Sequence, residues 1–415
     1  MLPFESFTLA NGLRIIVHKD KSTPMVAMNI IYKVGSRDES PDRTGFAHLF
    51  EHLMFGGSVN IPKYDEPLQK AGGENNAFTN NDYTNYYLTI PKNNIETAFW
   101  LESDRMLSLA FSEKSLDVQR QVVIEEFKQN YLNQPYGDVY LLLKPMAYQK
   151  HPYQWNTIGK DISHIEQAGM QDVKSFYHKY YNPDNAILSV AGDISTGEIS
   201  RLAEKWFGPI PSGKAFTRNY PTEPRQTELR ELTVNRNVPQ NAIYMAWHMP
   251  KRAESGFYKT DLISDVLSNG NSSRMYQNLI KKSKMFSEIS AFVTGDLDQG
   301  LFIVSGRLLN GASREDAGKL IFDEMNRICN DLVEVDELKK VNNKIEANLL
   351  FSRMSVLSKA MNLAYYEMLG SASMINDEVE NYQQVSRKDI KQKANEIFVE
   401  TKPSILYYQA VNGNG

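Results

Sequence analysis

Short apolar runs and amphipathic stretches alternate along the 415 residues of this chain. Residues 7–18 alternate around Asn11-Gly12, a pair that favours the tight turn of a β-hairpin. Apolar residues at a spacing of two predict strands, and apolar residues three or four apart predict amphipathic helices. On this basis the first half contains further strands at 25–34, 76–79, 84–90 and 186–191 and helices at 43–55, 64–71, 95–109, 115–130, 172–181 and 195–207.

The same order of elements starts again after a proline-rich stretch. Residues 209–226 contain four prolines and few consecutive apolar residues, as expected of a linker. Each half reads as strands, helices, strands, long helices and a final strand, which indicates a duplicated unit of about 200 residues. In the second half we predict strands at 232–234, 242–248, 289–293, 301–307 and 404–409 and helices at 259–267, 273–282, 313–329, 335–350, 355–369 and 387–398.

This repeat predicts an α+β fold with two homologous domains. Each domain is expected to be an α/β-sandwich-like unit, in which helices lie on one face of a mixed, mainly antiparallel sheet. The expected boundaries are an N-terminal domain at 1–210, a linker at 211–226 and a C-terminal domain at 227–415. The chain is longer than one hydrophobic core usually organises, which agrees with more than one domain.

Composition and charge exclude several classes of function. Apolar residues make up 41% and charged residues 23%, as in an ordinary soluble globular protein. The net charge of -4 gives no basic face for nucleic acid, and no apolar run approaches the roughly 20 residues that span a membrane. The first residues show no export signal, so we expect a cytoplasmic protein, with a periplasmic one as the alternative if a signal peptide has been removed. Cys329 is the single cysteine, which excludes an internal disulfide.

The candidate chemistry lies in the predicted helix at 43–55. His48 and His52 are four residues apart and therefore stand one turn apart on one helix face, with Glu51 at the edge of that face. Two imidazoles and a carboxylate so arranged are suited to a divalent metal with a bound water. The spacing His-x-x-Glu-His is the inverted zincin motif.

A catalytic zinc ion usually takes three protein ligands, so a further ligand is expected on another element. The predicted helix at 115–130 offers a Glu-Glu pair beside apolar residues. We expect Val122, Val123 and Phe127 to form its buried stripe, with Glu125 and Glu126 both at the border of that stripe. Spacing alone does not choose between the two glutamates.

The chain resembles the M16 peptidases, the family of pitrilysin, insulin-degrading enzyme and mitochondrial processing peptidase, and most closely its short bacterial processing-peptidase-like members. That resemblance implies a half-clamshell fold of the LuxS/metallohydrolase-like type. It covers most of the first half and only a little of the second, around Asn271-Ser-Ser-Arg-Met-Tyr276. The segments that carry it are Asn11-Gly-Leu13, Gly45 to Phe55, Gly72-Gly-Glu-Asn-Asn-Ala-Phe-Thr79, Arg120-Gln-Val-Val-Ile-Glu-Glu126 and Asn133-Gln-Pro-Tyr-Gly137.

The resemblance implies roles for individual residues. It makes Glu126 the third ligand, beside His48 and His52, of one zinc ion (Zn2+) per chain, and Glu51 the base that activates a zinc-bound water. It also implies that an extended peptide pairs with the strand segment Asn76, Ala77 and Phe78. The expected function is a zinc-dependent endopeptidase that hydrolyses short unfolded peptides in an enclosed chamber. The alternative is a non-catalytic, core-type structural or peptide-binding subunit of the same fold.

The chain departs from the family pattern in two respects. Gln119 stands where many relatives have a glutamate that supports the metal ligands. The amide can still form hydrogen bonds, so we expect metal affinity to shift rather than vanish. Relatives also carry an Arg and a Tyr in the second half, and alignment puts Ile280 and Ser287 at those positions. We therefore expect a dimer, and hypothesise that a zinc-less homologous subunit supplies the missing Arg and Tyr, with this chain as the catalytic subunit.

Overall fold

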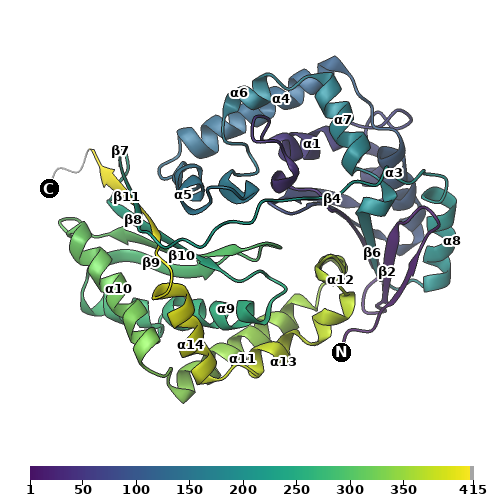
Figure 1. The fold of residues 1–415 in the computed structure, drawn as a ribbon. Helices are drawn as coiled ribbons and strands as arrows, with labels where there is room; N and C mark the ends of the chain where they lie inside the picture. Colours follow the sequence, from purple (N-terminus) through teal and green to yellow (C-terminus); the bar gives the residue numbers. More distant parts are fainter. Residues whose placement is uncertain (412–415) are drawn as a thin grey trace. The chain divides into compact units, whose positions relative to one another are not determined.

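The computed structural model describes residues 1–411 and divides them into two compact units, each described by itself below. The first unit consists of Met1–Lys128, Trp155–Tyr220 and Leu350–Asp377. The second unit consists of Gln129–Gln154, Pro221–Leu349 and the described residues from Glu378 onward. Both units are therefore assembled from segments that are distant in the sequence (Figure 1).

The first unit is built on a sheet whose six strands lie, within the described residues, in the order β1-β2-β6-β3-β5-β4. β2 and β6 are parallel, and the other neighbours are antiparallel. The predicted hairpin is confirmed, with Gly12 at a φ of 91° in its turn. The strands are β1 (Glu5–Thr8), β2 (Arg14–Lys19), β3 (Met25–Tyr32), β4 (Glu74–Thr79), β5 (Thr84–Pro91) and β6 (Ala186–Gly192).

Helices cover both faces of this sheet. On one face, Tyr32 of β3 contacts the ring of Tyr181, which in turn contacts Phe50 of α1. On the other face, α12 packs through Val356 and Ala360 on the small residues of β3 and β6. The longer helices are α1 (Phe46–Met54), α2 (Asp65–Lys70), α3 (Ile95–Leu107), α4 (Glu113–Phe127), α6 (Ile162–Glu166), α7 (Met170–Tyr180), α8 (Thr196–Trp206) and α12 (Val356–Leu369). Short 3-10 turns occur at η1 (Ser36–Asp38), η2 (Lys92–Asn94), η5 (Pro183–Asn185) and η7 (Ala372–Asn376).

The second unit repeats the first sheet without its extra edge strand. Within the described residues its five strands lie in the order β7-β11-β8-β10-β9, with β7 parallel to β11 and the other neighbours antiparallel. This is the order β2-β6-β3-β5-β4 of the first unit, which confirms the predicted duplication of an α+β unit. The strands are β7 (Arg230–Arg236), β8 (Ala242–Met249), β9 (Phe286–Val293), β10 (Gly300–Leu308) and β11 (Ser404–Ala410).

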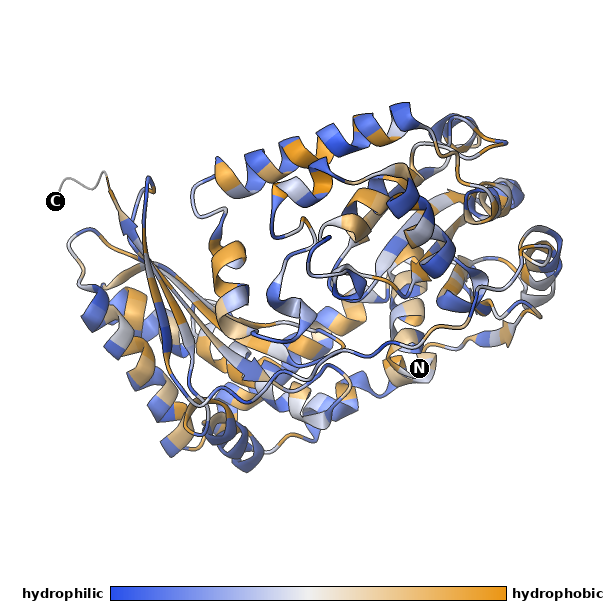
Figure 2. Ribbon diagram, turned by 45° about the horizontal axis from the view of Figure 1, so that its top comes forward, coloured by the Kyte–Doolittle hydropathy of each residue, from blue (hydrophilic) through white to orange (hydrophobic). Residues whose placement is uncertain are grey.

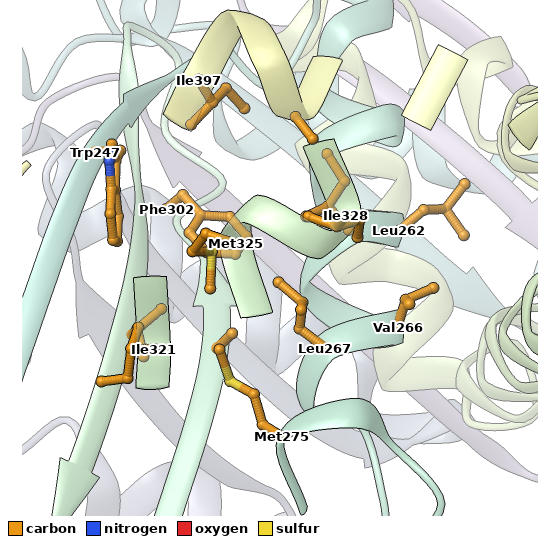
Figure 3. Close-up of a cluster of buried hydrophobic side chains, with 14 of the residues drawn as sticks. Trp247, Leu262, Val266, Leu267, Met275, Phe302, Ile321, Met325, Ile328 and Ile397 are labelled. Atoms are coloured by element: carbon orange, nitrogen blue, oxygen red, sulfur yellow. The ribbon is translucent and has the colours of Figure 1, made fainter. Parts of the chain in front are cut away.

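The main hydrophobic core of the second unit lies between this sheet and α9, α10 and α14. Figure 3 shows Trp247 and Phe302 of the sheet beside Leu262, Met325 and Ile397 of these helices. The opposite face of the sheet is covered by α5, through Val139 and Leu143 among others. The helices are α5 (Val139–Ala147), α9 (Ser255–Ser268), α10 (Arg314–Asn330), α11 (Val335–Ser352), α13 (Glu378–Gln383) and α14 (Arg387–Phe398). Two π-helical segments, η3 (Lys128–Leu132) and η6 (Tyr276–Lys282), and a 3-10 turn, η4 (Pro152–Gln154), complete them.

Each sheet thus has one helix that comes from the other half of the sequence. α5 lies in the first half but packs on the second sheet, and α12 lies in the second half but packs on the first. Residues 211–226, the predicted linker, form neither helix nor strand. Hydrophilic and hydrophobic residues alternate along the helices (Figure 2), and within residues 1–411 no helix combines the length and apolarity needed to cross a membrane.

Candidate metal centre

Helix α1 starts at a glycine and a buried carboxylate. Gly45 has a φ of 89°, and a Cβ there would lie 2.8 Å from the carbonyl oxygen of Ile158, so glycine is required. The Glu39 carboxylate, which is 7% exposed, accepts the N–H groups of Gly45 at 3.0 Å and Ala47 at 2.8 Å. These bonds satisfy two of the N–H groups at the start of the helix that have no partner within it.

One face of α1 is held by a cluster of aromatic rings. The Phe50 ring lies 4.4 Å from that of Tyr181 and 5.6 Å from that of Phe176, measured between centroids. Residues 46, 47, 49, 50, 53 and 54 are all buried, whereas His48, Glu51 and His52 are only partly so. Packing of the buried face therefore fixes the rotation of α1 about its axis, so that His48, Glu51 and His52 lie on the other face of the helix.

Helix α4 carries the Glu-Glu pair past this face. Ser112 caps the helix by accepting the N–H of Ser115 at 3.1 Å. Val123 and Phe127 are buried as expected, but the prediction for Val122 is wrong, because its side chain is 39% exposed. Val122 lies one turn before Glu126 on the side of α4 away from the core, so the apolar stripe is narrower than the sequence suggests.

The structure brings together His48, His52 and Glu126, the three predicted metal ligands. The Nε2 atoms of the two histidines are 3.2 Å apart. Glu126 Oε2 lies 3.5 Å from His48 Nε2 and 3.7 Å from His52 Nε2. The two imidazole ring planes are perpendicular, and both Nε2 atoms lie within 3.7 Å of the same Glu126 oxygen. Glu125, the other candidate, pairs with Lys128 at 2.8 Å and takes no part in this cluster.

Burial controls the charge of these groups. Burial, and secondarily the neighbouring His52, lowers the pKa of His48 to about 3, so its ring is neutral at pH 7. Burial also raises the pKa of Glu51, with Glu126 acting in the same direction, while the Thr79 hydrogen bond and His52 act in the opposite one. A neutral imidazole has a free electron pair on one nitrogen, which is the form that binds metals.

The donor set fits a divalent metal ion. Two imidazole nitrogens and one carboxylate oxygen all lie within 4.8 Å of one another, and this is a set that zinc takes at catalytic centres. Three electron-pair donors this close are mutually unfavourable unless a proton or a cation lies between them. His48 Nδ1 is buried and, within residues 1–411, has no hydrogen-bond partner. Gln119, two turns before Glu126 on α4, makes no described hydrogen bond to it.

The predicted substrate strand lies at the edge of the first sheet. Asn76, Ala77 and Phe78 belong to β4, which pairs with β5 on one side and, among the described strands, with none on the other. The strand contacts α1. Sequence analysis missed Thr79 at the end of this strand, whose hydroxyl donates to Glu51 Oε2 at 2.5 Å. It also missed Glu39, since neither residue belongs to a recognisable spacing pattern.

Ile280 and Ser287, the positions aligned with the Arg and Tyr of relatives, lie in the second unit. Ile280, in the π-helix η6, packs against the main core. The Ser287 hydroxyl, on β9, is placed to donate to Gln240 Oε1 at 3.0 Å. Both side chains therefore make contacts within their own unit, and neither carries a guanidinium or a phenol group.

A duplicated mixed α/β fold with two histidines and a glutamate converging from α1 and α4 is typical of a metal-dependent hydrolase. The family model described as "Insulinase (Peptidase family M16)" matches residues 14–161 of this chain. The model described as "Peptidase M16 inactive domain" matches residues 168–345. The chain therefore belongs to peptidase family M16.

Individual relatives agree with this assignment. The zinc protease PqqE of Helicobacter pylori is 27% identical over 97% of this chain and 92% of its own length. The probable mitochondrial-processing peptidase subunit beta of Schizosaccharomyces pombe is 24% identical over 99% of this chain and 92% of its own. The crystal structure of a protease from Helicobacter pylori superposes with a TM-score of 0.92 at 27% identity, over 99% of this chain and 100% of that one.

Proposed function

We propose that this chain is a zinc-dependent endopeptidase that hydrolyses short unfolded peptides. The observation that carries the proposal is the convergence of His48, His52 and Glu126, with the partly buried carboxylate of Glu51 on the same helix. The relative named zinc protease PqqE, which matches almost the whole chain, supports the same chemistry.

In this proposal His48, His52 and Glu126 hold one zinc ion. When bound, zinc supplies a Lewis acid that acidifies water and polarises a carbonyl group. Glu51 accepts the proton of the attacking water and delivers it to the leaving nitrogen as the C–N bond breaks. Burial strengthens this role, because a raised pKa brings the Glu51 carboxyl closer to neutral pH as a proton carrier.

The substrate is proposed to bind as an extended strand on the open edge of β4. Main-chain hydrogen bonds to Asn76, Ala77 and Phe78 would hold any unfolded peptide with little demand on sequence. A folded protein cannot present such a strand, which accounts for the preference for unfolded peptides. The cellular compartment stays a prediction.

Substitution of Glu51 by Gln tests the function. The Glu51→Gln variant should bind one zinc ion per chain and lose about 10²- to 10⁴-fold in turnover of a quenched fluorescent peptide. Glu125→Gln, which removes the neighbouring exposed carboxylate on α4, is the matched control and should retain both zinc and activity. Unchanged turnover in Glu51→Gln would contradict the proposal and favour a non-catalytic subunit.

We also propose that the active form is a dimer with a homologous subunit that supplies the Arg and Tyr absent at Ile280 and Ser287. The relative from Schizosaccharomyces pombe is by name one subunit of a processing peptidase, which supports a paired assembly. Purified alone, the chain should turn over peptide slowly. Equal rates with and without the homologous subunit would overturn this part.

A further inference from the structure

The carboxylate of Glu51 is held by a single hydroxyl group from the edge strand. Thr79 Oγ1 donates to Glu51 Oε2 at 2.5 Å, whereas its next oxygen neighbour, Thr84 Oγ1, is 3.4 Å away. The Thr84 hydroxyl donates its own proton to the carbonyl oxygen of Val34 at 2.9 Å. The single Thr79 proton is therefore directed at Glu51.

This bond distinguishes the two oxygens of the carboxylate. Within residues 1–411 no second hydrogen bond to the Glu51 side chain is described, so Oε2 is engaged and Oε1 is not. A hydroxyl that donates to one carboxylate oxygen restricts rotation of the group and leaves the other oxygen as the better proton acceptor.

We propose that Thr79 is a positioning residue for Glu51, which holds Oε2 so that Oε1 takes the proton of the attacking water. This inference rests on the proposed function. One water is consumed and the amide C–N bond breaks. The proton accepted by Oε1 passes to the leaving nitrogen, so Glu51 ends the cycle ionised and Thr79 keeps its own proton.

The location of Thr79 connects substrate binding to this arrangement. Thr79 and Ala77 are two residues apart on β4, so their side chains lie on the same face of the sheet. A peptide that pairs with the open edge of β4 would order the strand that carries the hydroxyl. The hydroxyl proton itself is used by Glu51, so its loss should affect the chemical step and leave peptide binding unchanged.

Three substitutions separate positioning from a structural role. Thr79→Val removes the hydroxyl and keeps the β-branched shape, and Thr79→Ser restores the hydroxyl. Thr89→Val is the matched control, because the Thr89 hydroxyl on neighbouring β5 donates to another carboxylate, Glu74 Oε1, at 3.3 Å. We expect Thr79→Val to lower kcat about 10- to 100-fold with unchanged KM and zinc content. Thr79→Ser should stay within about 3-fold of the wild-type kcat, since it restores the bond, and Thr89→Val should match wild type.

A structural readout accompanies the kinetics. In crystals of the metal-free protein, the Glu51 carboxylate should leave its position beside residue 79 in Thr79→Val and keep it in Thr79→Ser. A wild-type kcat in Thr79→Val, or an equal loss in Thr79→Val and Thr79→Ser, overturns the inference. If Thr79→Val does not fold, Thr79→Ala replaces it in the same comparison.

The failure of this inference is distinguishable from failure of the proposed function. An inactive Glu51→Gln beside a fully active Thr79→Val would remove only the role of Thr79. An active Glu51→Gln would remove both the base and the residue that positions it.

Discussion

Helices α1 and α9 follow the equivalent strands β3 and β8 of the two repeated sheets. The polar side chains of the two helices differ in their hydrogen-bond partners. In α9, Asp261 accepts the Tyr382 hydroxyl at 2.6 Å, and Asp265, four residues on, accepts the side-chain amide of Asn269 at 2.7 Å. In α1, His48 and His52 have the same spacing, yet their Nε2 atoms face each other and Glu126.

The difference shows what turns a shared topology into a metal centre. α9 contributes Leu262, Val266 and Leu267 to the core, as Figure 3 shows, and its acids are paired within the protein. α1 buries an equally apolar face but leaves electron-pair donors directed at one another. The fold places a helix at the same point of each unit, whereas the chemistry depends on which side chains that helix directs at one place.

The sharpest test of this comparison removes one member of each pair. His52→Ala should abolish stoichiometric zinc binding and lower turnover by a factor on the order of 10⁴, because both the metal and its chemistry are lost. Asp265→Ala removes the corresponding side chain of α9 and should leave zinc content at one ion per chain, with a loss of stability of about 1 kcal/mol. Metal analysis and a peptide assay give both answers. Zinc retained in His52→Ala would show that α1 and α9 do not differ in this way.

Much of this contrast can be predicted from the sequence, because it rests on local patterns. The hairpin at Asn11-Gly12, the alternating strands and the His48–His52 spacing all follow from turn chemistry and periodicity. The choice of Glu126 over Glu125 needed either the family resemblance or the structure, since both border the same stripe. Val122 was misplaced because a valine in a helix is expected inside, and nothing in the spacing shows that it is 39% exposed.

Long-range packing is the part that the sequence does not reveal. Helix α5 was not predicted. Its apolar residues lie on several sides, so they give no clear helical periodicity, and Pro145 is unfavourable inside a helix. α12 was predicted as a helix, but chain order gives no sign that it packs on the first sheet. Thr79 and Glu39 are likewise visible only when β4 and residue 39 are brought beside α1.

The pH dependence of stability tests the comparison through Asp261 of α9. Burial raises the pKa of Asp261 from its ordinary 3.8 to about 6, while the hydrogen bond from Tyr382 acts in the opposite direction. Asp265 and Glu378 raise it further and Arg252 lowers it. The folded protein therefore holds the proton more tightly than the unfolded chain, so this contribution to stability is full below about pH 4 and is lost as the pH rises through about 6.

Asp261→Asn imitates the protonated form and should not show this loss. The rise from 3.8 to about 6 corresponds to about 3 kcal/mol, at about 1.36 kcal/mol for each pH unit. The free energy of unfolding of Asp261→Asn, relative to wild type, should therefore increase by up to about 3 kcal/mol between pH 4 and pH 7. Urea titrations at several pH values measure it, with Asp336→Asn, an exposed carboxylate on α11, as the control. A constant difference would mean that Asp261 titrates normally.

The starts of the two helices give the smallest expected effect. Glu39 accepts two N–H groups at the start of α1, whereas Glu254, the residue before α9, makes no side-chain bond to its helix. Glu39→Gln keeps the size of the side chain but turns an amide N–H₂ toward one of the backbone donors. It should lower the free energy of unfolding by about 2 kcal/mol.

Because His48 follows Ala47 directly, Glu39→Gln should also weaken zinc binding, by roughly 10-fold, the range seen when groups that orient metal ligands are lost. Glu254→Gln, the matched change at α9, should alter stability by less than about 0.5 kcal/mol and leave zinc affinity unchanged. Competition with a chromophoric chelator measures the affinity, and urea titration the stability. Equal effects of the two substitutions would show that Glu39 contributes no more to α1 than Glu254 contributes to α9.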